Sequence, residues 1–511
     1  MSEQDVIVVG CGPVGLVLTA LLGKAGHSVL VLERYPGRYG LPRAASFDSE
    51  TLRTMAALGL APALLPGLHV QERYEWRNRQ GELLIEQVCR SIGDSGWPDM
   101  ATFHQPDLEN ALHELCRSLP SVELRFGTTV TAVNQQDDQV VVRTDTGEDF
   151  AARYVIGADG GNSFVREALG IGLDDLGFSE PWLVCDFKLR RPAEELGLPG
   201  ALQIGDPDEP TTIITTGSGH QRFCFMLDTE ADLDVERSKT RAWERVRRYL
   251  STDDADLVRV ADYTFRSLIA HQWRDRRVLL AGDAAHQMPP FLGQGLCSGI
   301  RDAGNIAFKL DWVLRGVHDS AVLDTYQTER EPHVRAITAT SMRLGRQHTL
   351  RDPVLAAERD EELRTRRAAL VEPDRIRLPG LGPGFFGPGG RTLSVQGRAS
   401  NGRMTALLDE LVGSGFRLLA TEDALADIDP EAVSTAGITL VGLGAQAQGV
   451  VLSDVDGTHY DWLRSLGATA AVVRPDNYVL VSGQDAAEVS RRAIELLAPD
   501  AMVDQTGQQR M

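Results

Sequence analysis

The sequence predicts a mixed α/β fold built from three parts. Short β-branched runs at residues 5–10 and 28–33 flank a glycine-rich turn and a helical pattern, which is typical of a βαβ unit. Residues 175–270 change to closely spaced strands such as WLVCDFKL, TTIITT and RFCFML, which favour an antiparallel sheet. A Gly- and Pro-rich stretch at 378–390 then marks a boundary before a smaller α/β domain.

Length and composition agree with a globular protein of several domains. The chain has 511 residues, 42% of them hydrophobic and 24% charged, which is more than one core normally supports. A net charge of -20 argues against nucleic acid or an anionic membrane as a partner, because such a surface repels phosphate. We expect no secretory signal, no membrane span and no metal site. Six scattered cysteines without a CxxC pair predict reduced thiols in a cytoplasmic protein.

The first βαβ unit carries a dinucleotide-binding pattern. Gly10, Gly12 and Gly15 form GxGxxG between a strand and a helix. In this context the three glycines permit a tight turn, close approach of a pyrophosphate and packing of the helix on the sheet. Glu33 ends the next strand, where its carboxylate would bind ribose hydroxyls. An acidic residue there disfavours a 2′-phosphate, which leaves FAD or NAD.

Two later strands are expected in the same parallel sheet. The runs at 153–158 and 277–282 each end in a Gly, Ala and Asp turn. We therefore assign 1–174 and 271–377 to one dinucleotide-binding domain, the second piece including a helical stretch from about 295 to 370. The other predicted parts are a substrate lobe at 175–270, a linker at 378–390 and a third domain at 391–511.

The turns after these strands carry two long motifs. They are GADGGNSFVR at 157–166 and AGDAAHQMPPFLGQGLCSGIRDAGNIAFKL at 281–310. Together with the N-terminal fingerprint, they resemble the signatures of class A flavoprotein monooxygenases, the group with the p-hydroxybenzoate hydroxylase fold. The similarity is greatest to 3-(3-hydroxyphenyl)propionate, phenol and polyketide-tailoring hydroxylases. It implies non-covalent FAD, with NADH or NADPH as a transient co-substrate that has no Rossmann domain of its own.

The residues of the third motif suit a flavin. Asp283, at the carboxyl end of a strand, can bind ribityl hydroxyls. Gly293, Gln294 and Gly295 then expose amides at the start of a long helix, which stabilises the negative charge of a reduced flavin. The resemblance implies that Asp159 and Arg166 touch the flavin and nicotinamide sides, that Arg43 and Gln105 reach the ribityl and pyrophosphate region, and that Val130 meets adenine. The remaining predicted cofactor residues are Pro13, Val14, Arg34, Gly282 and Pro290.

The resemblance also implies the reaction. NAD(P)H reduces FAD, O2 adds to give a C4a-hydroperoxyflavin, and its distal oxygen hydroxylates a phenolic aromatic compound. A base that deprotonates the phenol would help, and Asp48 is the first candidate, although an N-cap of the following helix explains this residue better. His286 and Pro290 are the other catalytic candidates, and Gln287 lies beside them.

The third domain resembles the thioredoxin-like extension of phenol hydroxylases. It has no cysteine, since the last one in the chain is Cys297, so thioredoxin-type redox chemistry is excluded. GLGAQAQG at 442–449 only partly matches a nucleotide motif, because a strand-like segment follows it. We expect this domain to be structural, covering the flavin lobe or pairing two subunits in a homodimer.

Three other functions stay open at this point. The same flavin chemistry could carry out epoxidation or Baeyer-Villiger-like oxidation of a polyketide or antibiotic. A flavin oxidase or dehydrogenase would share the first fingerprint, but we do not expect it to carry both later motifs. A flavin-binding protein without turnover is the most remote alternative.

Overall fold

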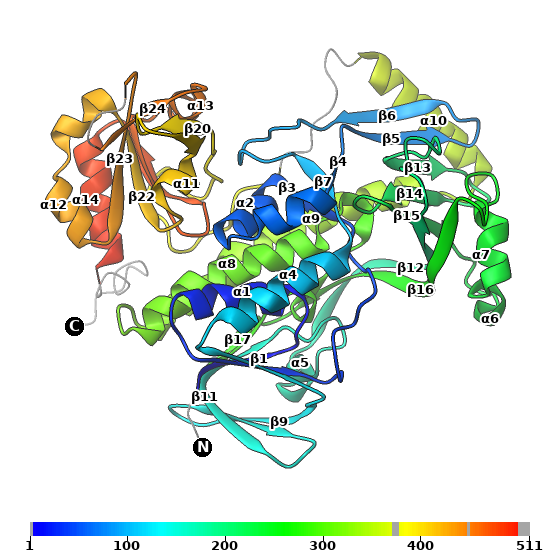
Figure 1. Ribbon diagram of the computed structural model, residues 1–511, viewed down its shortest axis with the longest axis horizontal. Coiled ribbons are helices and arrows are strands. Elements are labelled where there is room, and N and C mark those ends of the chain that lie inside the picture. Colours follow the sequence, from blue (N-terminus) through cyan, green and yellow to red (C-terminus); the bar gives the residue numbers. More distant parts are fainter. Residues whose placement is uncertain (1–3, 370–377, 447–449, 499–511) are drawn as a thin grey trace.

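The protein is built around two large sheets and a separate C-terminal sheet (Figure 1). The computed structural model describes residues 4–369, 378–446 and 450–498. Within these ranges no helix combines the length and the apolar character that crossing a membrane requires.

The first sheet contains the predicted βαβ unit. Its parallel strands are, in spatial order, β18 (Val278–Leu280), β11 (Asp149–Gly157), β1 (Gln4–Val9), β2 (Val29–Glu33) and β8 (Val122–Phe126). The runs predicted at 153–158 and 277–282 therefore lie beside the first strand, which confirms their assignment to this sheet. The short β17 (Arg274–Asp275) and the antiparallel pair β9 (Val130–Gln135) and β10 (Val140–Thr144) extend it.

Three helices pack beside this sheet. They are α1 (Pro13–Lys24), α4 (Gln105–Ser118) and α8 (Gly295–Leu314). The approach of α8 to α1 is close because a Cβ on Gly299 would lie 2.5 Å from a methyl group of Val14. The packing brings the starts of α1 and α8 to the same end of the sheet (Figure 1).

The second sheet is antiparallel apart from one pair of strands. Its order is β19 (His286–Gln287), β16 (Ala255–Ala270), β12 (Leu173–Leu189), β15 (His220–Met226), β14 (Thr211–Thr215), β13 (Ala201–Gly205), β5 (Arg73–Asn78) and β6 (Leu83–Val88). Strands β12, β13, β14, β15 and β16 pair with one another in antiparallel fashion, which confirms the antiparallel sheet predicted within 175–270. Strands β5 and β6 come from the first part of the chain, and β5 joins β13 in parallel.

A small three-stranded sheet is formed by short strands from the N-terminal part of the chain. It consists of β3 (Ser46–Asp48), β7 (Met100–Thr102) and β4 (His69–Val70). Helix α2 (Ser49–Ala57) follows β3 directly, and the carboxylate of Asp48 accepts a hydrogen bond from the Thr51 N–H at 2.8 Å. The predicted N-cap role of Asp48 is thus confirmed.

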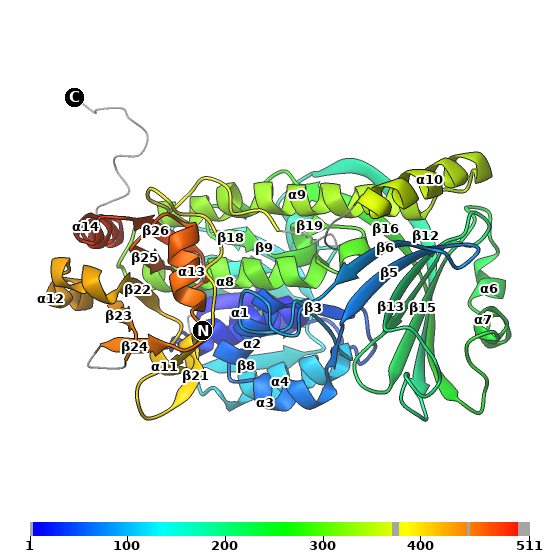
Figure 2. The ribbon, with the colours of Figure 1, turned by 90° about the horizontal axis from the view of Figure 1, so that it is seen from above.

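The predicted helical stretch after residue 295 is also confirmed. Figure 2 shows α8 and α9 (Thr325–His348) running from the C-terminal domain toward the second sheet, with α10 (Pro353–Ala369) beyond them. Shorter helices are α3 (Ala61–Leu64), α5 (Phe164–Ala168), α6 (Leu233–Glu236) and α7 (Lys239–Val246). Residues 378–390 contain neither a helix nor a strand, as their Gly and Pro content predicts.

The C-terminal part has its own sheet with helices around it (Figure 1). The strand order is β21 (Thr405–Leu407), β20 (Arg398–Ser400), β24 (Val451–Asp454), β23 (Ile438–Gly444), β22 (Phe416–Thr421), β25 (Ala470–Val473) and β26 (Val479–Gly483). Its helices are α11 (Leu408–Val412), α12 (Pro430–Thr435), α13 (Thr458–Ser465) and α14 (Ala486–Leu497). The strand expected after GLGAQAQG is confirmed as β24; residues 447–449 of that motif lie outside the described ranges.

Candidate active site

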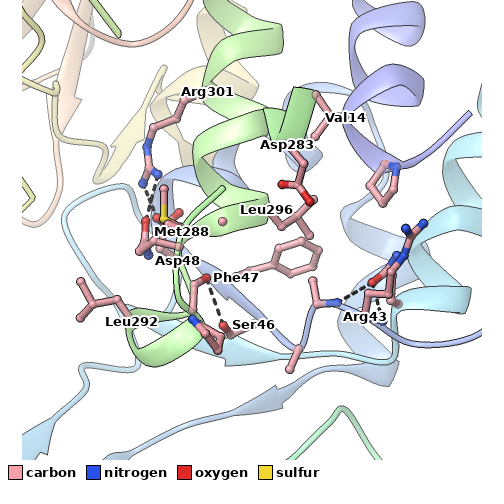
Figure 3. A pocket seen from close by; sticks show the side chains of 18 of the residues that line it. Val14, Arg43, Ser46, Phe47, Asp48, Asp283, Met288, Leu292, Leu296 and Arg301 are labelled. Atoms are coloured by element: carbon pink, nitrogen blue, oxygen red, sulfur yellow. Dashed lines mark hydrogen bonds and ion pairs between the residues drawn. The ribbon is translucent and has the colours of Figure 1, made fainter. Parts of the chain in front are cut away.

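One large cavity of about 1560 Å³ reaches all parts of the fold. Its wall is formed by the turn before α1, the start of α8, the second sheet and a strip of the C-terminal domain. Figure 3 shows the part of the wall that lies around Val14, Asp283 and Leu296. Most of the predicted site residues lie on this wall. They are Gly10, Gly12, Pro13, Val14, Glu33, Arg34, Arg43, Asp48, Gln105, Val130, Asp159, Asp283, Pro290, Gly293, Gln294 and Gly295.

The glycine turn before α1 is shaped to receive a ligand. Gly10 has φ +106°, and a Cβ there would lie 2.4 Å from the Ala158 carbonyl oxygen. A Cβ on Gly15 would lie 2.3 Å from the Gly10 carbonyl oxygen, so both glycines serve close backbone packing. Gly12 is different, because a Cβ added there would have no atom within 4 Å apart from its chain neighbours. The turn therefore leaves open space at the start of α1, where a pyrophosphate would fit.

The carboxylate of Glu33 is held by the backbone beside this turn. It accepts hydrogen bonds from the N–H of Cys11 at 2.8 Å and of Tyr35 at 3.0 Å. Each carboxylate oxygen can accept a further hydrogen bond, so contact with a ribose hydroxyl stays a prediction. Arg43 is exposed, and its guanidinium lies over the ring of Tyr39, 4.7 Å from the ring centroid.

Asp283 is the polar group of the cavity that lacks a partner. Its carboxylate points into the cavity in Figure 3 and makes no hydrogen bond or ion pair within the described part of the chain. Asp283 is exposed, and it faces the open space of the cavity, where the surrounding protein removes part of the bulk solvent and raises its pKa, against the attraction of His286 and Arg43. Both oxygens of this carboxylate are therefore free to accept hydrogen bonds from the hydroxyl groups of a ligand in the cavity.

The turn into α8 completes this part of the wall. Gly293 has φ +64°, and a Cβ there would lie 2.2 Å from the Ser46 hydroxyl oxygen, so only glycine fits. No side chain caps α8 in the structure, and its first amides therefore remain free to bind a ligand. Open space at Gly12, the lone carboxylate of Asp283 and these amides together fit an extended FAD.

A buried ionic cluster lies beside the turn into α8. The Arg301 guanidinium donates to Glu50 at 2.6 Å, to the side-chain oxygen of Gln294 at 3.0 Å and to Asp48. Burial opposes ionisation of Asp48, but Arg301 and the Thr51 N–H outweigh it and lower its pKa. Asp48 is therefore an ionised carboxylate, which is a weak base, and its proposed role as the base stays a prediction.

Four of the predicted residues lie off the cavity wall and have structural contacts. Gly15, in the first turn of α1, allows close packing on the Gly10 carbonyl, and Gly282 forms a backbone turn with φ +60°. The buried Arg166 guanidinium donates to the carbonyl oxygens of Gly161 and Ala284, each at 3.1 Å. The Nε2 atom of His286 lies 2.6 Å from Asp302. The nicotinamide role of Arg166 and the catalytic role of His286 stay predictions.

Two predicted residues on the wall also bind the backbone. The Gln105 side-chain oxygen accepts from the N–H groups of Arg43 at 2.9 Å and Ala44 at 2.6 Å. Asp159 accepts from the Ser163 hydroxyl at 2.5 Å, and it thereby supports the start of α5. These contacts fix the loops around the cavity.

The second sheet supplies a wall that sequence reasoning did not identify. Tyr74 and Gln203 line the cavity, and the Tyr74 hydroxyl donates to the Phe291 carbonyl oxygen at 3.4 Å. The Trp76 indole donates to the Gln203 side-chain oxygen. Other residues of this wall are Val184, Thr212, Ile214, Cys224, Tyr263 and Phe265. No motif marks them, because they come from strands far apart in the sequence.

Comparison with known proteins matches the chain to a family of FAD-binding proteins. A family described as FAD binding domain matches residues 3–341, and one described as HcaD C-terminal domain matches residues 392–496. A probable NADH-specific resorcinol 4-hydroxylase from Rhodococcus jostii is 48% identical over 510 residues, covering 98% of this chain and 96% of that protein. A 3-(3-hydroxy-phenyl)propionate/3-hydroxycinnamic acid hydroxylase from Mycolicibacterium gilvum is 34% identical, with 83% and 77% covered.

Solved structures share the whole fold. The flavin-dependent monooxygenase PieE, in complex with FAD and substrate, has a TM-score of 0.77 at 22% identity, with 97% of this chain and 99% of that chain covered. Aklavinone-11 hydroxylase, in a complex with FAD and aklavinone, has a TM-score of 0.76 at 24% identity and the same coverage. The p-nitrophenol 4-monooxygenase of Pseudomonas putida has a TM-score of 0.65 at 28% identity, with 71% and 93% covered.

Proposed function

The chain belongs to the family described as FAD binding domain, and we propose that it is an NADH-dependent monooxygenase for a small neutral phenol of the resorcinol class. It is an FAD-dependent aromatic hydroxylase. The proposal concerns which phenol and which nicotinamide it uses. The relative that is 48% identical is named for resorcinol and NADH, whereas relatives near 34% identity are named for hydroxyphenylpropionate.

The observation that carries the proposal is the neutral character of the second-sheet wall. Two arginines of this sheet line the cavity. Arg222 is buried, and its donors bind Asp186 at 2.7 Å and the carbonyl oxygens of Pro42 and Arg43. Arg266 is exposed to solvent, where an ion pair contributes little. A substrate carboxylate would therefore find no buried arginine of this sheet with free donors, while a phenol can use the hydroxyl and amide of Tyr74 and Gln203.

The protein's own residues hold the cofactor and keep the reaction site dry. The turn at Gly12, the carboxylate of Asp283 and the amides at Gly295 would bind the pyrophosphate, the ribityl chain and the flavin ring of FAD. When bound, FAD takes a hydride from NADH and uses O2 to insert one oxygen atom into the substrate ring. The positive end of α8 stabilises negative charge on the reduced ring. Apolar Met288 and Leu296 line the same space and exclude water.

The experiment is a substrate panel with a fixed amount of NADH. Resorcinol and 3-(3-hydroxyphenyl)propionate are compared for substrate-stimulated NADH oxidation, and each product is identified by mass after reaction in 18O2. We expect one labelled oxygen in a trihydroxybenzene, one NADH consumed per product, and weaker use of NADPH. Preference for the carboxylated phenol would contradict the substrate assignment. Label found only in H2O2 and water, with oxygenation of a non-aromatic compound, would favour the epoxidation or Baeyer-Villiger alternative.

Some finer assignments belong to the same proposal. The C-terminal domain is thioredoxin-like in fold, which is supported by the parallel pair β22 and β23, the antiparallel pair β25 and β26, and the closing helix α14. We also propose the boundaries of the five predicted segments, a homodimeric assembly and a cytoplasmic location. The six cysteines, all free in the structure, support a reducing compartment.

A further inference from the structure

The C-terminal domain reaches the active-site cavity through Tyr478. This residue directly precedes β26, and it is only 3% exposed. Its hydroxyl lies 3.5 Å from a carboxylate oxygen of Glu50, at the upper limit of a hydrogen bond, and both residues line the cavity. A residue more than 400 positions away in the chain thus meets the start of α2.

Glu50 continues this contact to the cofactor side of the cavity. The same carboxylate oxygen of Glu50 accepts from Arg301, and Arg301 also donates to Gln294. Gln294 is the residue before α8, and Arg301 lies two helical turns further along. A chain of contacts therefore leads from Tyr478 to the turn that presents the free amides of α8.

The charges in this cluster need a further donor. Asp48 and Glu50 share one guanidinium, that of Arg301, whose side chain is 3% exposed. Burial is the largest influence on Glu50; together with the charge of Asp48 it raises the pKa of Glu50 against the attraction of Arg301. A hydroxyl is suited to this position because it can donate to an ionised carboxylate and accept from a protonated one.

The position of Tyr478 is fixed by two buried ionic contacts between the domains. Arg53 of α2 donates to both carboxylate oxygens of Asp409, at 2.6 and 2.9 Å. Arg474, four residues before Tyr478, donates to Glu329 of α9 at 2.8 and 3.2 Å. Two-point contacts of this kind restrict rotation as well as distance. The C-terminal domain is thus held against the helices that begin or end near the cavity.

We propose that Tyr478 is a positioning residue of the flavin site, through which the C-terminal domain holds Glu50, Arg301 and the turn from Gly293 to Gly295 in the geometry that receives FAD. The inference rests on the FAD site of the proposed function and is independent of the substrate. It gives the C-terminal domain a part in the active site in addition to the structural role expected from its sequence.

The test compares Tyr478→Phe with Tyr460→Phe. Tyr460 lies in the same domain, donates its hydroxyl to the Leu443 carbonyl oxygen at 2.6 Å and is absent from the cavity wall, so it is a matched control. Each apoprotein is titrated with FAD by flavin fluorescence, and the visible spectrum of the bound flavin and the thermal midpoint are recorded. We expect Tyr478→Phe to weaken FAD binding about threefold to tenfold, the effect of one hydrogen bond, and to shift the spectrum. The control should change only the thermal midpoint.

A double-mutant cycle with Glu50→Gln tests the path of the effect. If Tyr478 acts through Glu50, the two substitutions are not additive in FAD affinity. Equal FAD affinity and spectrum in Tyr478→Phe and Tyr460→Phe would overturn the proposal, and so would strict additivity with Glu50→Gln. These measurements need no aromatic substrate, so failure to hydroxylate resorcinol leaves them unaffected.

Discussion

The cofactor side of the cavity and the interface with the C-terminal domain differ in how their carboxylates are paired. At the interface, Glu329 accepts from Arg474, Lys309, Asn305 and the Phe385 N–H. On the cofactor side, Asp283 has no hydrogen-bond partner among the described residues. Glu329 is fully buried and needs these partners, which indicates a structural role, whereas Asp283 is open to the cavity and can accept hydrogen bonds from a ligand.

The largest expected effect comes from breaking the interface cluster. Glu329→Gln leaves the buried Lys309 without its carboxylate partner and leaves Arg474 paired with Asp476 alone. We expect a loss of about 3–5 kcal/mol in the free energy of unfolding, measured by denaturant titration. The control is Glu331→Gln on the same helix, which removes the half-exposed pair with Arg335. It should cost less than about 1 kcal/mol. Equal losses in both variants would contradict the proposed stabilising role of the ionic cluster around Glu329.

The same cluster predicts how stability depends on acid. Although burial opposes it, the charges of Arg474 and Lys309 lower the pKa of Glu329 from 4.5 to about 2. A lowered folded pKa means that the unfolded chain binds more protons in this range, so the contribution is complete above about pH 4.5 and is lost as pH falls toward 2. The difference in unfolding free energy between wild type and Glu329→Gln should therefore shrink between pH 6 and pH 3. A constant difference would show that Glu329 does not carry this dependence.

Substitution of Asp283 should affect FAD binding and not the stability of the folded chain, which is the opposite of the effect expected for Glu329. Asp283→Ala should weaken FAD binding by about 1–3 kcal/mol, since buried ribityl hydroxyls lose their acceptor. The thermal midpoint of the apoprotein should stay the same or rise, because the pKa of Asp283 is raised by burial and its charge is unfavourable without a ligand. Fluorescence titration and thermal unfolding of the apoprotein measure the two effects. If Asp283→Ala strongly destabilised the apoprotein and left FAD affinity normal, Asp283 would have the structural role that we assign to Glu329.

A smaller effect is expected on the substrate side. Tyr74→Phe removes the hydroxyl of a residue that lines the cavity, and we expect KM for the phenol to rise by up to about tenfold, the effect of one hydrogen bond, with FAD affinity unchanged. Steady-state NADH oxidation measures this. Tyr249→Phe, on the same lobe but away from the cavity wall, is the control. Equal KM values would place the substrate elsewhere in the cavity.

The residues whose local conformation agrees with the sequence prediction act through their own backbone. Gly10 and Gly293 adopt positive φ angles, and Asp48 caps the helix that begins one residue later. Such roles depend on a few consecutive residues, so a motif records them. Arg166 and Gln105 show the limit of this reasoning. Long polar side chains can turn either to a ligand or to nearby carbonyl and amide groups, and here both bind the backbone.

The sequence by itself determined the strand, turn and helix units, their order, and the glycine and aspartate positions that suit a dinucleotide, because these depend on local conformation and on the period of apolar residues. The tertiary structure alone decided which distant side chains meet in the cavity. Tyr74 enters by strand pairing, and Arg301 and Tyr478 enter by the packing of α8 and of the C-terminal domain. Such contacts join residues hundreds of positions apart, and no local pattern encodes them. Their partners are set by the burial of charge, which only the folded chain produces.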